Sequence, residues 1–88
     1  MNLYSVKDNV SGAFYPPEMY EKDELIIRVY KNYVNSGKKD TLLATNPGDF
    51  TIYKIGTFDY QKTGKVTAIE LEFVCNLNDL VEVPHGEA

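Results

Sequence analysis

The sequence predicts an α+β fold, in which a three-stranded, mainly antiparallel sheet carries one amphipathic helix on one face. The order is β-α-β-β, followed by a short C-terminal helical turn. Three observations predict it. Apolar residues repeat at helical spacing between residues 24 and 36. Two β-rich runs, at 50–55 and 67–73, flank a Thr63-Gly64 turn signal and indicate a hairpin. A β-prone alternation at residues 3–6 supplies a further strand.

The length and composition of the chain indicate one small folded domain. Its 88 residues are 43% hydrophobic and 25% charged, values typical of a globular protein. We expect a single domain over residues 1–83 and a flexible tail over 84–88. The sequence shows no signal peptide and no apolar stretch near the ~18 residues that a membrane span needs, so we expect neither export nor a membrane span.

The first strand, residues 3–6, is expected to end at the polar residues Lys7-Asp8-Asn9. Residues 10–20 are expected to form a loop, because the pair Pro16-Pro17 fixes an extended backbone and removes two amide donors. Phe14, Tyr15, Met19 and Tyr20 indicate that this loop lies on the core, and the alternative is that it forms a lip that contacts a ligand.

The helix is predicted to begin at Asp23, whose carboxylate is expected to cap it, and to end before Gly37 as a C-terminal cap. Its apolar arc spans roughly 200°, wider than the ~100° that packing on one sheet requires. Two explanations for how the extra apolar flank is covered remain. Either the loop over residues 14–20 wraps across it, or a homodimer or another partner covers it.

The second strand is predicted to start at Phe50 after a turn over residues 46–49. Its apolar residues on both faces suit a central strand, or a strand whose phase is shifted by a bulge at Gly56. Gly64 is expected to adopt positive φ. The third strand alternates, and its apolar row is expected to face the core while its other row faces water. The apolar row is Thr67, Ile69, Leu71 and Phe73, and the other is Ala68, Glu70 and Glu72. Asn76 or Asn78 is expected to cap a helical turn that carries Leu80 and Val81 to the core.

No group of residues in the sequence forms a catalytic, metal or cofactor site, and we expect a protein that is not an enzyme. The only histidine, His85, lies near the end of the chain without a nucleophile or second ligand in sequence reach. The only cysteine, Cys75, has apolar neighbours that indicate a buried structural thiol. Glu70 and Glu72 provide too few ligands for calcium.

The charge balance, nine basic against thirteen acidic residues, disfavours general nucleic-acid binding, so any DNA affinity would need a local patch. Tyrosines beside lysines and a basic stripe on the helix are candidate contacts to a partner or to single-stranded DNA. A structural role for the tyrosines, at the boundary of the core, is the alternative. The candidate contact residues are Arg28, Lys31, Lys38, Lys39, Tyr53, Lys54 and Tyr60.

Several motifs together resemble a known viral family. They are Met1-x-Leu-Tyr-Ser-Val-Lys-Asp8, a helix containing Ile27-Arg-Val-Tyr30, Asn46-Pro-Gly-Asp-Phe-Thr-Ile-Tyr-Lys-Ile-Gly-Thr-Phe-Asp59, Thr63-Gly64, and Val74-Cys75 before Asp79-Leu80. The chain is similar over about residues 1–81 to the small nonstructural protein of gokushovirus-type microviruses, which are phages with single-stranded DNA genomes.

The resemblance implies a role in the host bacterial cytoplasm, in viral single-stranded DNA synthesis and the switch to genome packaging. It implies an adaptor that acts by protein-protein binding, with the viral replication initiator complex or procapsid components as partners. Neither a cofactor nor a membrane is implied. The alternative is a single-stranded DNA-binding protein that uses surface tyrosines and the local basic stripe.

Overall fold

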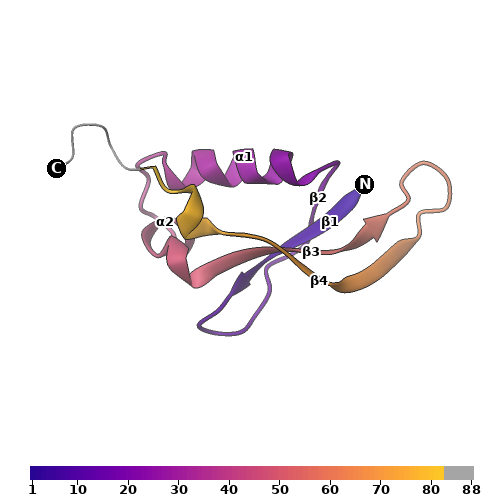
Figure 1. The fold of residues 1–88 in the computed structure, drawn as a ribbon, viewed down its shortest axis with the longest axis horizontal. Coiled ribbons are helices and arrows are strands. Elements are labelled where there is room, and N and C mark those ends of the chain that lie inside the picture. Colours follow the sequence, from indigo (N-terminus) through magenta and orange to yellow (C-terminus); the bar gives the residue numbers. More distant parts are fainter. Residues whose placement is uncertain (83–88) are drawn as a thin grey trace.

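The computed structural model describes residues 1–82 of the 88-residue chain. The predictions for His85 and for the tail at 84–88 lie outside the described residues. The fold is α+β, as predicted: an antiparallel sheet with one long helix on one side (Figure 1). The strands are β1 (Asn2–Asp8), β2 (Glu18–Tyr20), β3 (Phe50–Phe58) and β4 (Val66–Asn76). The helices are α1 (Asp23–Val34), the single turn α2 (Leu42–Thr45), and the 3-10 turns η1 (Pro47–Asp49) and η2 (Leu77–Leu80).

The sheet has four strands in the order β2-β1-β3-β4, whereas the sequence predicted three. The additional strand, β2, lies within the segment that was predicted to be a loop. Its three residues follow Pro17 directly, so each has an amide hydrogen and is free to pair with β1. Tyr20 lies opposite Asn2, and Glu18 lies opposite Tyr4.

Helix α1 packs on one face of the sheet, and the main core lies between them. Ile26 and Val34 of α1 meet Tyr4, Val6, Phe50, Ile52, Cys75 and Leu77. The predicted cap at Asp23 is wrong, because Lys22 holds the N-cap position without a side-chain cap. Asp23 is the first helical residue, and its carboxylate accepts a hydrogen bond of 2.5 Å from the hydroxyl of Tyr4. Asn35, and not Gly37, is the C-cap.

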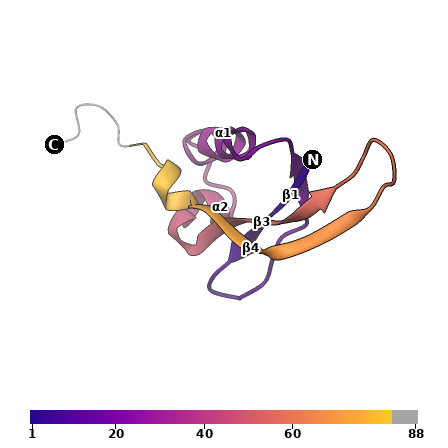
Figure 2. The ribbon, with the colours of Figure 1, turned by 45° about the vertical axis from the view of Figure 1, so that its right-hand side comes forward.

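The extra flank of α1 is covered in part by β2 and α2. Tyr20 and Leu43 pack against the core, and the Tyr30 hydroxyl donates a hydrogen bond to the Glu18 carboxylate. The loop over residues 14–20 thus covers part of this flank, as one of the two predicted coverings supposed: besides β2, the Tyr15 ring packs edge-on against Phe50 of the core, with ring centroids 5.9 Å apart. The stretch directly after β1 lies on the side of the sheet away from α1 (Figure 2).

The β3–β4 hairpin extends beyond the body of the molecule as an arm (Figure 1), and the whole fold measures 52 × 26 × 21 Å. Its closing turn is held by Asp59, which accepts a hydrogen bond of 2.8 Å from the Thr63 hydroxyl. Gly64 has φ +69°, as predicted. β3 is an interior strand, which is one of the two alternatives that its apolar faces suggested. Its pairing with β4 also shifts between Lys54 and Gly56, but the extra residues lie on β4, since Lys54 pairs with Glu72 and Gly56 pairs with Ala68.

The predicted orientation of the last strand is wrong. A second shift in the pairing of β3 with β4 falls between Ile52 and Tyr53, so that Ile52 pairs with Cys75 but Tyr53 pairs with Phe73. The extra residue on β4, Val74, changes the phase of the alternation. Cys75 and Leu77 therefore enter the core, while Leu71 and Phe73 lie on the opposite face of the sheet.

The C-terminal turn forms where the sequence placed it. The Asn76 side chain caps η2 by accepting a 2.8 Å hydrogen bond from the amide of Asn78. Leu77 is buried, and Leu80 packs against the core. Val81, expected to reach the core, is exposed.

Candidate binding site on the open face of the sheet

The face of the sheet that points away from α1, called the open face below, is apolar and only partly covered. Tyr53 and Ile55 come from β3, and Leu71 and Phe73 come from β4. Leu71 is 54% exposed and Phe73 is 62% exposed. Large apolar side chains that gather at one exposed place on a protein mark a site of interaction.

The segment between β1 and β2 adds the aromatic side chain of Phe14 to the open face. Its backbone is fixed at Tyr15, whose amide donates to the Val6 carbonyl at 2.8 Å. The Tyr15 carbonyl in turn accepts a 2.7 Å hydrogen bond from the Ser5 hydroxyl. Phe14 forms a bridge with Lys7. These contacts hold Phe14 on the open face, while the Tyr15 ring packs edge-on against Phe50 of the core, with ring centroids 5.9 Å apart.

Three aromatic rings form a row across the open face. The ring centroids of Phe14 and Tyr53 lie 6.3 Å apart, and those of Tyr53 and Phe73 lie 6.4 Å apart. The Lys7 ammonium lies 5.6 Å from the centre of the Phe14 ring, within the range of a cation–π contact. Rings held side by side in this way offer rigid apolar contact area with little side-chain entropy to lose.

Beside this row lies an open hollow of about 360 Å³. The residues that line it are mostly apolar: Ser5, Phe14, Tyr15, Pro17, Ile55 and Leu71. The only aliphatic hydroxyl among them, that of Ser5, is already donated to Tyr15. The hollow therefore suits an apolar side chain of a partner.

Two of the predicted contact residues, Tyr53 and Lys54, are neighbours in sequence but lie on opposite faces. Tyr53 forms the middle of the aromatic row. Lys54 points to the helix side, where its ammonium pairs with Glu72 at 3.0 Å and with Asp23 at 3.7 Å. The hydrogen bond to Glu72 is the main cause that raises the pKa of Lys54. Lys54 is thus already paired, and Tyr53 remains available.

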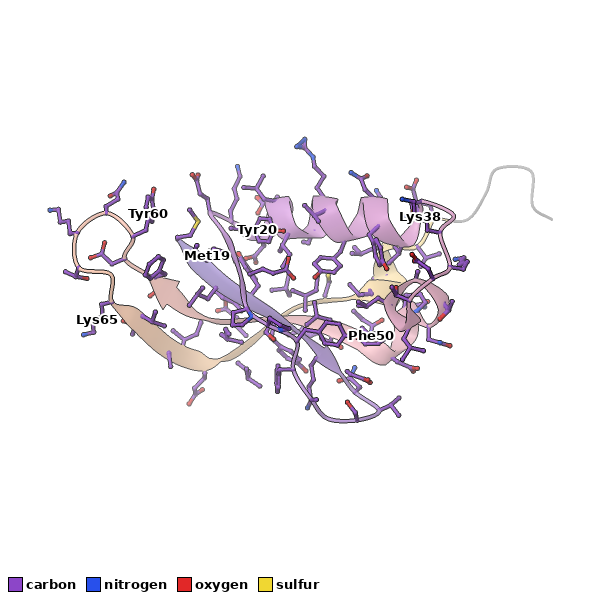
Figure 3. The ribbon with its side chains drawn as sticks, turned by 180° about the vertical axis from the view of Figure 1, so that it is seen from behind. Met19, Tyr20, Lys38, Phe50, Tyr60 and Lys65 are labelled. Atoms are coloured by element: carbon purple, nitrogen blue, oxygen red, sulfur yellow. The ribbon has the colours of Figure 1, made fainter. Side chains whose placement is uncertain are left out.

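The other predicted contact residues lie far from the aromatic row. Tyr60 is 53% exposed in the turn that closes the arm. Arg28 and Lys31 are exposed on α1, in the layer that covers the opposite face of the sheet. Lys38 and Lys39 follow α1, and Figure 3 shows Lys38 at the opposite end of the molecule from Tyr60 and Lys65. The structure does not bring the predicted set together into one surface.

Sequence reasoning missed Leu71 and Phe73 as residues of the open face, and for Phe14 it favoured core cover over contact with a ligand. The clean alternation of β4 assigned Leu71 and Phe73 to the core. A signal against that assignment exists in the sequence: Phe73, Val74 and Cys75 are three apolar residues in a row, as expected where a bulge changes the phase of a strand.

Two further groups of the described residues bear on the protein's chemistry, the Cys75 thiol and the acidic side chains. Burial raises the pKa of the Cys75 thiol to about 11, so this thiol is protonated at neutral pH. Within residues 1–82, no three His, Cys, Asp or Glu side chains gather as a metal ion would require.

A second hollow, of about 260 Å³, lies between α1, α2 and β2 beside Val29 and Tyr33. None of the described helices is long and apolar enough to cross a membrane.

Comparison with known proteins gives one match. The model of the phage ORF5 protein family matches residues 1–80, nearly the whole described chain. No curated protein and no solved structure matches. By this match, the chain belongs to the phage ORF5 protein family.

Proposed function

We propose that this phage protein is a non-enzymatic adaptor that acts by binding other proteins. Its role would lie in the host bacterial cytoplasm, in viral single-stranded DNA synthesis and in the switch to genome packaging. Membership of a phage protein family supports a role in infected bacteria. The resemblance to the small nonstructural protein of gokushovirus-type microviruses supports a role in DNA synthesis and packaging. The viral replication initiator complex and procapsid components are the proposed partners.

The open face is the observation that carries this proposal. It places Leu71 and Phe73, both more than half exposed, beside an apolar hollow. Leaving such side chains in water is unfavourable by ~25 cal/mol per Å² relative to burial, so a partner that covers them gains free energy. Protein interfaces use aromatic anchors and apolar pockets in this way.

A second candidate, single-stranded DNA binding, is favoured by the row of Phe14, Tyr53 and Phe73 with Lys7 at one end. Nucleotide bases stack on exposed aromatic rings, and each stacked base is worth ~1–3 kcal/mol. We rank it second because the chain has an excess of acidic residues and the basic residues of α1 lie on the other layer.

A pull-down of the tagged chain from infected bacteria, with and without nuclease, tests the adaptor proposal. The adaptor predicts that the replication initiator or procapsid proteins stay bound after nuclease treatment. Loss of every partner after nuclease treatment would reject it in favour of the DNA-binding candidate. The latter also predicts that the affinity for an oligo-dT strand falls steeply with added salt.

A further inference from the structure

The sheet ends on β4 without a neighbour beyond it. β4 is the longest strand, with 11 residues, and it is the last in the sheet order. All of residues 66–73 are exposed. The outer edge of a terminal strand presents unpaired backbone amides and carbonyls, which can hydrogen-bond to an extended segment of another chain.

The opposite end of the sheet shows how little is needed to close an edge in this fold. There, β2 covers β1 with only three residues, Glu18–Tyr20. A segment of comparable length suffices beside β4. The stretch Leu71–Phe73 is suited to it, since the two shifts in pairing with β3 lie on either side of its regular pairs at Glu72 and Phe73.

The inner neighbour of this stretch shows which side chains fit beside it. On β3, Tyr53 lies opposite Phe73, and Lys54 lies opposite Glu72. The aromatic pair lies on the open face, with ring centroids 6.4 Å apart, and the ion pair of 3.0 Å lies on the helix side. On its inner side, this stretch therefore has an aromatic residue opposite Phe73 and a cationic residue opposite Glu72.

The outer edge retains negative charge for a second cation. The Glu72 side chain is 58% exposed although it pairs with Lys54. Glu70 is exposed as well, and it forms no ion pair with any residue in the described part of the chain. Two carboxylates thus lie along this edge with a single lysine, while Leu71 and Phe73 offer apolar contact on the other side.

We infer that the outer edge of β4 at Leu71–Phe73 binds a short extended segment of a partner protein in which apolar residues alternate with Lys or Arg. The segment adds a fifth strand to the sheet. Its cation lies beside Glu72, and its apolar residues lie beside Leu71 and Phe73 on the open face. This inference rests on the proposed adaptor function and names the chemistry of the segment bound.

The same charges disfavour a second copy of this chain as the occupant. An antiparallel pairing of Leu71–Phe73 with itself is centred on residue 72, so that Glu72 would lie opposite Glu72 of the other copy. Like charges directly opposite each other destabilise a strand pair. A basic segment has the complementary charge instead.

The test uses capped hexapeptides and the full chain. The first peptide alternates Lys and Val, the second alternates Glu and Val, and the third is the Lys-Val peptide with alternate amides N-methylated. We expect only the first to bind, with shifts of the amide NMR signals concentrated in residues 70–74. The substitution Glu72→Gln should weaken its binding about threefold. The control Glu21→Gln changes an exposed carboxylate remote from β4 and should leave binding of the Lys-Val peptide unchanged.

Three results would overturn the edge proposal: equal binding of the Glu-Val peptide, undiminished binding of the N-methylated peptide, or a wild-type chain that is dimeric in solution and binds no peptide. The two proposals fail separately. If the replication initiator stays bound after nuclease treatment but no peptide binds, the adaptor stands and the edge site is rejected. If the Lys-Val peptide binds but no protein partner survives nuclease treatment, the edge site stands and the adaptor role is rejected.

Discussion

Tyr4 of β1 and Asp23 at the start of α1 are joined by a hydrogen bond of 2.5 Å, which ties the sheet to the helix. The Tyr4 ring is completely buried, and its hydroxyl also accepts a hydrogen bond of 3.2 Å from the Asn2 side chain. The same carboxylate lies 3.7 Å from the Lys54 ammonium. One phenol thus fixes the first turn of α1 over β1.

Removing that hydroxyl with Tyr4→Phe should lower the free energy of unfolding by about 1 kcal/mol, because a partly buried hydrogen bond to a carboxylate is lost while the ring stays in place. Urea unfolding followed by circular dichroism measures it. Tyr60→Phe, which changes an exposed tyrosine in the arm, is the control and should have no effect. Equal stability of the Tyr4→Phe variant and the wild type would refute the role given to this contact.

The Gly56→Ala variant should be strongly destabilised, because a Cβ at this position would lie 2.5 Å from the carbonyl oxygen of Thr67 in β4. Relieving that overlap requires a backbone shift, at a cost of about 1–3 kcal/mol. Gly48→Ala is the matched control, since its Cβ would come no closer than 3.9 Å to the Asn78 side chain. Thermal unfolding of the two variants should differ clearly, and similar melting temperatures would contradict the pairing of Gly56 with β4.

Stability should fall as the pH rises from 9 towards 11, because burial raises the pKa of the Cys75 thiol from 9.0 to about 11. The unfolded chain loses this proton first, so the contribution is complete below pH 9 and disappears as the pH passes the folded pKa. In the Cys75→Ala variant, stability should fall less between pH 9 and 10 than it does in the wild type. Above pH 10 a decline should remain, because burial also raises the pKa of Tyr30. Urea midpoints across this range are the measurement, and identical slopes would contradict the burial of the thiol.

Phe73→Ser should change the free energy of unfolding by less than about 1 kcal/mol, because the side chain is 62% exposed and contributes little to the main core. Val66→Ser, with 61% exposure on the same strand, is the matched control. A loss of several kcal/mol in the Phe73→Ser variant would show that this ring belongs to the core, as the sequence alternation suggested.

The sequence predicted the elements better than their orientation. Helix α1 and the β3–β4 hairpin follow from local signals, namely apolar residues at helical spacing and the Thr63-Gly64 turn. Local signals do not show which side chains of β4 face the core, because the extra residue Val74 reverses which of them meet the helix. The strand β2 was missed because three residues after a proline pair carry almost no periodicity. The open face depends on the phase of β4 and on the path of the chain into β2, so it could not be predicted from the sequence.

The most direct test of the central claim, that this protein acts by binding proteins on its open face, is the amount of replication initiator retained after nuclease treatment by three chains. These are the wild type, Phe73→Ser and Val66→Ser. We predict that the wild type and Val66→Ser retain similar amounts, and that Phe73→Ser retains at most about a tenth, as expected for loss of an aromatic anchor. Equal retention by all three folded chains would contradict the claim.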